Sequence, residues 1–233
     1  LTRGNALVVR DAATGAVLAR QPLPVPPGGA LNWEHLLLAN FDTTTVSEDI
    51  VVEALIPGKQ YLEGRALAAF TLEEINAFER SANPIWQRVD FLSLAHGGAR
   101  VADLDGDGVH EILGGEIVSD TGETLLKLAI EGHVDSLYVA DVRPDLPGLE
   151  VVVLEEGGPQ RVFLAARNEV IWQAENGHRE PQNAAVGEFD MSRPGLEIWC
   201  RSRADRNQKP WVFDAQGELI AEYAFEDSAP RGW

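Results

Sequence analysis

The stretch ADLDGDGVHEIL, residues 102–113, places three aspartates and two glycines between two short apolar segments. Asp103, Asp105 and Asp107 occupy alternate positions 1, 3 and 5 of this loop, so an extended turn directs all three side chains inward. The glycines between them let the backbone curve around an ion, and Ca²⁺ takes about six to eight oxygen ligands. We therefore predict a calcium-binding loop.

Val109 and Glu111 complete the predicted ligand set, through a backbone carbonyl and a carboxylate at loop position 9. A helix–loop–helix calcium site needs its glutamate at position 12, where this chain has Gly114, and it needs flanking helices. The flanking segments here resemble strands, so that class of site is excluded. A solvated acidic turn without an ion is the alternative, and repulsion among three close carboxylates disfavours it. We expect the ion to fasten two strands together.

The same pattern recurs along the chain, in copies that begin at Val101, Val139 and Val186. Each copy has an apolar strand, an acidic residue, a turn of Asp, Gly, Pro or Ser, and an acidic residue that leads a second strand. A fainter copy begins at Leu38. The acidic or amide pairs are Asp103 with Glu111, Asp141 with Glu150, Glu188 with Glu197 and, in the faint copy, Asn40 with Asp49.

A hairpin-like segment follows each copy, which gives four short strands per unit at offsets of 38 residues (103 to 141) and 47 residues (141 to 188). This periodicity is typical of β-propeller blades. We expect an all-β fold, a single β-propeller domain over residues 1–233 with four-stranded blades. The expected units are a partial one at 1–30 and blades at 31–88, 89–130, 131–178 and 179–233.

The N-terminal hairpin lacks inner strands, so about four and a half blades are present. Either the ring closes with about five blades, or the chain is a fragment of a larger propeller, which we favour because unpaired strand edges are unfavourable. The chain begins with Leu1 and has no signal-peptide pattern, so we expect a mature or trimmed form. Residues 71–82, TLEEINAFERSA, fit either a helix or a strand.

The sister loops keep fewer oxygen ligands than the first. In the second copy Arg143 replaces the middle acid and could neutralise the site internally. We predict weaker metal sites in both sister loops. Their ligands would be Asp141, Asp145 and Glu150 in one loop, and Glu188, Asp190, Ser192 and Glu197 in the other.

The quoted residues carry a family resemblance. ADLDGDGVHEI resembles the FG-GAP/VCBS calcium repeat of bacterial and integrin-type propellers. The segments DLPGLE and SRPGLE, together with EGHVDSLYVADV, resemble the propeller of rhamnogalacturonan lyases and related polysaccharide lyases over about residues 95–223. The resemblance implies a calcium-stabilised propeller that cleaves a uronate-containing glycan by β-elimination. A non-catalytic propeller for glycan binding or adhesion is the alternative, because this repeat also serves such roles.

Four of the five histidines, His35, His96, His133 and His178, each stand just before an expected innermost strand. They should therefore ring the propeller channel on the face opposite the calcium loops. Such a ring could supply a general base or bind a transition metal, or each histidine could simply hydrogen-bond a neighbouring loop. For β-elimination the candidate bases are His133 and His178, and His35 and His96 are candidates for substrate binding.

Basic residues gather in CRSRADRNQKP, residues 200–210, although the net charge of the chain is −18. Arg179, Arg201 and Arg203 are candidates for binding a uronate carboxylate, because arginine holds carboxylates in a bidentate manner. Ion pairs within the protein are the alternative. Trp33 and Trp211 are the candidates for stacking on a sugar ring.

The net charge of −18 argues against nucleic acid or an anionic membrane as a partner. No apolar run approaches the roughly eighteen residues that span a bilayer, so we expect no membrane insertion. Cys200 is the single cysteine, which excludes an internal disulfide and suggests a buried thiol. We expect a bacterial protein that is secreted, periplasmic or at the cell surface. Its expected partners are a uronate-containing polysaccharide and further blades or domains of the same gene product.

Overall fold

The computed structural model describes residues 5–43, 49–59, 64–71, 82–175, 181–202 and 210–222. In these ranges the chain is built from β-strands and one short 3₁₀ turn, Pro27–Gly29. It divides into two compact units, residues 1–127 and 128–233. Most of the segment predicted as either helix or strand, residues 72–81, lies outside the described residues.

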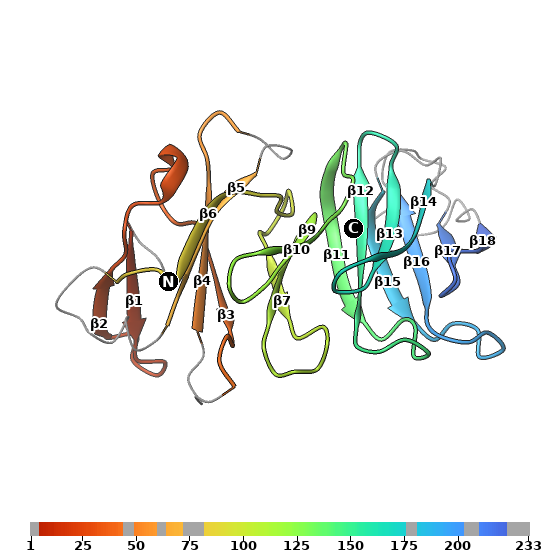
Figure 1. Ribbon diagram of the computed structural model, residues 1–233, viewed down its shortest axis with the longest axis horizontal. Coiled ribbons are helices and arrows are strands. Elements are labelled where there is room, and N and C mark those ends of the chain that lie inside the picture. The colour runs from red at the N-terminus through yellow and green to blue at the C-terminus, as the bar shows by residue number, and fades with distance from the viewer. Residues whose placement is uncertain are drawn as a thin grey trace. The chain divides into compact units, whose positions relative to one another are not determined.

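Unit 1 contains one two-stranded and two four-stranded antiparallel sheets, drawn from red to light green in Figure 1. The strands of each sheet follow one another in chain order, as expected for hairpin-connected strands. The two-stranded sheet consists of β1 (Ala6–Arg10) and β2 (Val17–Pro22). The first four-stranded sheet consists of β3 (His35–Ala39), β4 (Asp49–Leu55), β5 (Arg65–Phe70) and β6 (Trp86–Phe91). The second consists of β7 (Arg100–Ala102), β8 (Glu111–Leu113), β9 (Glu116–Val118) and β10 (Thr124–Lys127).

Unit 2 contains two further four-stranded antiparallel sheets with the same chain-order topology (Figure 1). The first has β11 (His133–Ala140), β12 (Glu150–Glu156), β13 (Arg161–Ala165) and β14 (Val170–Glu175). The second has β15 (Pro181–Gly187), β16 (Glu197–Ser202), β17 (Trp211–Phe213) and β18 (Leu219–Glu222).

The central strands are buried without alternation because both of their faces are covered. In β12 the six residues from Glu150 to Glu155 are all buried, and in β4 the six residues from Asp49 to Ala54 are buried. Continuous burial of this kind is expected for a strand between two packed layers. The outer strand β14 instead mixes exposed and half-buried residues.

The hydrophobic cores lie between successive sheets of each unit. One cluster joins Leu7 and Leu23 of the N-terminal segment to Ile50 and Phe70 of the next sheet. A second joins Val51 and Leu67 to Ile112 and Val118 of the β7–β10 sheet. In unit 2, one cluster joins the β11–β14 sheet to the β15–β18 sheet, with Val152 and Leu164 on one side and Ile198, Trp211 and Phe213 on the other.

A tryptophan on an outer strand covers a hairpin turn of the following sheet in both units. The Trp172 indole of β14 donates its Nε1–H to the Ala215 carbonyl oxygen at 3.0 Å, and a Cβ at Gly217 would lie 2.8 Å from the ring. In unit 1 the Trp86 indole contacts the backbone at Asp120 and Gly122 in the same manner. The glycines at these turns leave room for the indole ring.

The prediction of an all-β chain with repeated four-stranded antiparallel sheets is confirmed. The first complete sheet runs to Phe91, three residues beyond the expected boundary at 88. Closure of the sheets into a propeller stays a prediction. Within the described ranges, no helix has the length and apolar character needed to cross a membrane.

Candidate functional site

The Asp103 loop, between β7 and β8, brings three carboxylates together. One oxygen from each of Asp103, Asp105 and Glu111 lies within 4.8 Å of the other two, which is close enough for all three to reach one ion. Asp103 also organises the loop itself, since Oδ1 accepts the Gly106 N–H at 2.7 Å and Oδ2 accepts the Gly108 N–H at 2.9 Å.

Asp107 has a different neighbour in this loop. Its Oδ1 accepts the N–H of Val109 at 2.7 Å, and it does not belong to the group of three converging carboxylates. Of the four predicted side-chain ligands, three therefore converge, and Asp107 instead accepts the Val109 N–H.

The second acid of each copy has a structural role that the sequence analysis missed. All four are buried, and each accepts a backbone N–H from the loop that follows the first strand of its sheet. The bonds join Phe41 N to Asp49 Oδ2 at 2.8 Å, Leu104 N to Glu111 Oε2 at 3.0 Å, Arg143 N to Glu150 Oε2 at 2.9 Å, and Phe189 N to Glu197 Oε2 at 2.6 Å.

Burial raises the pKa of two of these acids. For Glu150, desolvation raises the pKa, and the N–H groups of Arg143 and Val142 oppose that effect. For Asp49, desolvation likewise raises the pKa, and the Phe41 N–H opposes it. Holding the loop therefore carries an electrostatic cost when these carboxylates are ionised.

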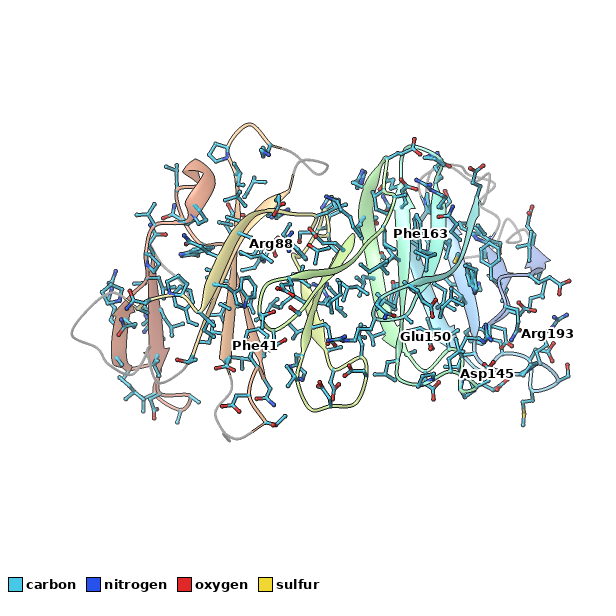
Figure 2. All side chains as sticks on the ribbon, in the orientation of Figure 1. Phe41, Arg88, Asp145, Glu150, Phe163 and Arg193 are labelled. Carbon is cyan, nitrogen blue, oxygen red and sulfur yellow. The ribbon has the colours of Figure 1, made fainter. Side chains whose placement is uncertain are left out.

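Both sister loops contain a guanidinium group. Arg143 makes a two-point ion pair with Asp145, with Nε–Oδ1 at 2.8 Å and Nη2–Oδ2 at 2.7 Å, and this bond lowers the pKa of Asp145. Arg193 lies 3.3 Å from Asp190 and 3.0 Å from Asp214. Figure 2 shows Asp145, Glu150 and Arg193 toward the end of unit 2 that carries these loops.

The remaining predicted ligands of the sister loops do not converge. Asp141 and Glu188 are exposed, and Ser192 donates its hydroxyl to Asp190 at 2.6 Å, which lowers the pKa of Asp190. Among the described residues, neither sister loop contains a group of three acidic or histidine side chains close enough to share an ion.

A second converging group lies at the opposite end of the β11–β12 strand pair. His133, Asp135 and Glu156 each offer one ligand atom, and these three atoms lie within 4.8 Å of one another. The register pairs His133 with Glu156 and Ala140 with Glu150, so this His133 cluster and the Asp141–Glu150 loop occupy the two ends of the strand pair.

A β-bulge adds the third side chain to the His133 cluster. The register passes from Val134 opposite Glu155 to Ser136 opposite Leu154, so Asp135 is the inserted residue. Such bulges redirect side chains near functional sites. The His133 Nε2 lies 3.3 Å from Glu156 Oε2, with both side chains half-buried.

Gln182 of β15 joins the His133 cluster to the neighbouring sheet. Its Nε2 donates to Glu156 Oε2 at 3.0 Å, and its backbone carbonyl accepts a bond from the Ser136 hydroxyl. One imidazole, two carboxylates and a neighbouring amide form a donor set suited to a divalent cation.

The structure corrects the prediction that Trp33 and Trp211 stack on a sugar ring. Trp33 is 3% exposed and donates its Nε1–H to the Pro24 carbonyl oxygen at 2.9 Å, and Trp211 is 0% exposed in the unit 2 core. Neither ring can face a sugar, because the apolar cores of the two units cover them. Trp33 lies near His35 in the sequence, and Trp211 follows the basic segment 200–210. These positions suggested sugar binding, but both rings pack in the cores.

The other described candidates lie on separate elements. His35 begins β3 opposite Glu53 and packs against Gly98, His96 is exposed in a turn, and Arg201 lies on β16 opposite Asn183. His178, Arg179 and Arg203 lie outside the described residues.

Asp135 and Glu156 were missed by the sequence analysis. The available signal was HVD, residues 133–135, which places an acid two positions after the histidine. The acid pair at residues 155–156, which ends the strand after the loop, was the complementary signal. Without the strand register, nothing in the sequence brings these segments together.

Comparison with known proteins identifies the class of this all-β chain with its converging acidic groups. Residues 81–230 match the family Rhamnogalacturonan lyase family 11, C-terminal domain, which is more than half of the chain. The chain belongs to this family.

Two curated relatives come from Bacillus subtilis (strain 168). Rhamnogalacturonan endolyase YesW is 32% identical over 105 residues, which are 43% of this chain and 17% of that protein. Rhamnogalacturonan exolyase YesX is 30% identical over 129 residues, 53% of this chain and 21% of that protein. The match thus spans about a fifth of the curated relatives.

Solved structures show the same fold. The crystal structure of rhamnogalacturonan lyase YesW aligns with a TM-score of 0.70 at 20% identity, over 93% of this chain and 37% of that one. The Bacillus licheniformis rhamnogalacturonan lyase PL11 aligns with a TM-score of 0.70 at 20% identity, over 95% of this chain and 38% of that one. The family match supports the lyase resemblance, and the FG-GAP/VCBS resemblance stays a prediction.

Proposed function

We propose that this chain is the part of a polysaccharide lyase that supplies a cation site to a β-elimination centre acting on a uronate-containing glycan. The observation that carries the proposal is the His133 cluster of one imidazole and two carboxylates, found in a chain of the rhamnogalacturonan lyase family. We also propose that the sheets form blades of a calcium-stabilised β-propeller, whose further blades lie elsewhere in a longer protein.

The chemistry requires charge neutralisation and a base. The base removes the proton on the carbon next to the uronate carboxylate, and the electron pair left behind forms a carbon–carbon double bond. The neighbouring glycosidic carbon–oxygen bond breaks, and the leaving oxygen takes up a proton. A cation on the carboxylate acidifies the proton that is removed and stabilises the negative charge that develops.

The His133 cluster fits the first of these roles. An imidazole nitrogen that binds a cation cannot also accept a proton, so we propose His133 as a cation ligand with Asp135 and Glu156, rather than as the base. His178 remains the proposed base. Arg179, Arg201 and Arg203 remain the proposed partners of the uronate carboxylate, with His35 and His96 as further substrate contacts.

The Asp103 loop is proposed as a separate, structural calcium site. Its three converging oxygens join the end of β7 to the start of β8, where Glu111 is buried. A bound calcium would offset the repulsion among these carboxylates and hold the loop closed. The proposed substrate is a polysaccharide, and we propose that the protein is secreted, periplasmic or at the cell surface.

The experiment uses the longer protein that contains this chain, with rhamnogalacturonan as substrate and Ca²⁺ in the buffer. The ultraviolet absorbance of the unsaturated uronate product measures the rate. We expect product from the wild type and a loss of at least about 100-fold for Asp135→Asn, because removal of one partner of an active-site charge costs several kcal/mol. Asp145→Asn, whose carboxylate pairs with Arg143, is the matched control and should retain the wild-type rate.

No new absorbance from the wild type would overturn the lyase proposal. Binding on a glycan array without turnover would then favour the non-catalytic alternative, a propeller for glycan binding or adhesion. Wild-type rates in His178→Ala would overturn the assignment of the base while leaving the cation site intact.

A further inference from the structure

A buried ion pair lies directly beside the His133 cluster in the sequence and in the sheet. Glu155 on β12 and Arg161 on β13 form a bond from Nε to Oε2 of 2.8 Å, with side chains 0% and 8% exposed. The Arg161 guanidinium also lies over the Phe163 ring, 5.2 Å from its centre. The attraction within a buried ion pair offsets the cost of desolvation only where additional hydrogen bonds satisfy both groups.

The partners of this ion pair belong to the segment that leads into β11. Glu155 Oε1 accepts the N–H groups of Glu131 at 2.6 Å and of Gly132 at 2.8 Å. Arg161 Nη2 donates to the Ala129 carbonyl oxygen and lies 3.4 Å from the Glu131 carboxylate. The ion pair therefore holds residues 129–132, and His133 is the next residue along the chain.

Gly132 brings the same segment against the strand that carries Glu156. A Cβ at residue 132 would lie 2.1 Å from the Glu156 carbonyl oxygen and 2.7 Å from the Gly157 carbonyl carbon. Only glycine allows this approach. As a result, His133 at the start of β11 lies opposite Glu156 at the end of β12, and their side chains are in contact.

We propose that Glu155 and Arg161 are positioning residues for the His133 cluster. Neither belongs to the cluster of three converging ligand atoms; they act by fixing the backbone that presents His133 opposite Glu156. This inference rests on the proposed function of the cluster as a cation site. Outer partners that orient metal ligands typically contribute about 10–100-fold to metal affinity.

Unit 1 offers a matched control. Arg65 begins β5 and pairs with the buried Glu53 of β4, with Nε–Oε1 at 3.2 Å, and Glu53 Oε2 accepts the Ala99 N–H at 2.8 Å. This pair has the same chemistry and a similar place in its sheet. Loss of this pair should cost stability without affecting His133.

The experiment titrates Ca²⁺ into the 233-residue chain labelled with ¹⁵N and follows the imidazole signals of His133, assigned with a His133→Gln variant. The amide signals of Gly106 and Gly108 report the Asp103 loop in the same spectra. We expect Arg161→Gln and Glu155→Gln to weaken Ca²⁺ binding at His133 by about 10–100-fold. Both should leave the Asp103 loop unchanged. Arg65→Gln should leave both sites unchanged.

Binding at His133 within twofold of the wild type in Arg161→Gln would overturn the positioning role, and so would equal weakening by Arg65→Gln. If Arg161→Gln does not fold, Arg161→Lys replaces it in the experiment. This variant keeps the charge but has fewer hydrogen-bond donors, so it should weaken Ca²⁺ binding at His133 to an intermediate degree. If Ca²⁺ leaves the His133 signals of the wild type unmoved, the cation proposal fails instead. The positioning role is then tested without metal, since it predicts one imidazole tautomer in the wild type and averaged signals in Arg161→Gln.

Discussion

At the scale of single residues, Arg143 and Arg193 distinguish the sister loops from the Asp103 loop. The Asp103 loop brings three carboxylates together, whereas each sister loop places a guanidinium against an aspartate. The substitution of Arg143 for the middle acid is visible in the sequence. The Arg143 guanidinium pairs with Asp145 at two points and supplies the positive charge that an ion would otherwise supply.

We predict that Arg143→Asp adds a calcium site to the chain, because it removes the internal cation and places a third carboxylate between Asp141 and Asp145. Equilibrium dialysis should show one more bound Ca²⁺ per chain than in the wild type. Arg143→Gln, which removes the charge without adding a ligand, is the control and should leave the number unchanged. An unchanged number in Arg143→Asp would contradict the interpretation.

A second residue-scale prediction concerns Glu150, whose pKa is raised by burial. A raised folded-state pKa stabilises the protein below the unfolded pKa, and that contribution is lost as the pH rises through the folded pKa. Glu150→Gln removes this loss, so its free energy of unfolding should improve relative to the wild type as the pH rises from about 4 to 7.

Urea unfolding at several pH values measures this change, with the exposed Glu188→Gln as the control. A constant difference between Glu150→Gln and the wild type over the whole pH range would show that the charge of Glu150 does not matter. The lost or retained hydrogen bond to Arg143 shifts the curve by a constant amount and does not imitate the pH trend.

At the scale of elements, strand and hairpin positions followed from the sequence, but contacts between sheets did not. Apolar runs around Asp-x-x-Gly segments predicted the hairpins, because local turn chemistry determines them. The place of Trp172 over the turn at Gly217 depends on packing between two sheets and has no local signal. Packing of this kind also explains why Trp33 and Trp211 were misassigned. Asp135 and Glu156 were missed because the register of two strands and a bulge bring them together, and neither has a local signal.

Gly217→Ala tests the tryptophan-over-turn contact. Gly217 has φ +85° and lies under the Trp172 ring, whereas Gly15 has φ +70° in the β1–β2 hairpin with nothing within 4 Å. Both substitutions to alanine cost about 1–2 kcal/mol for the left-handed backbone. Gly217→Ala should cost about 1–3 kcal/mol more, because the added methyl displaces the indole. Equal losses in urea unfolding would contradict a packing role for Trp172.

At the scale of the whole molecule, the net charge of −18 makes bound cations a general source of stability. Repetition in the sequence predicted four-stranded sheets correctly, because each repeat encodes one supersecondary unit. The His133 cluster requires two strands in register and one bulge, which repetition does not specify.

Calcium should therefore raise the thermal unfolding midpoint, since a ligand that binds only the folded state stabilises it by about 2.7 kcal/mol at 100 times its Kd. We expect chelation to lower the midpoint in the wild type and to have a reduced effect in Asp103→Asn. Asp141→Asn, in the loop with Arg143, should respond to chelation as the wild type does. A midpoint insensitive to calcium in the wild type would contradict a structural calcium site.

The most direct test of the central claim is an anomalous difference map from crystals of this chain grown with Ca²⁺. The account predicts a peak among His133, Asp135 and Glu156, in addition to one among Asp103, Asp105 and Glu111. A map with no peak within ligand distance of His133, at calcium concentrations that fill the Asp103 loop, would contradict the claim that this chain supplies the cation site of a lyase.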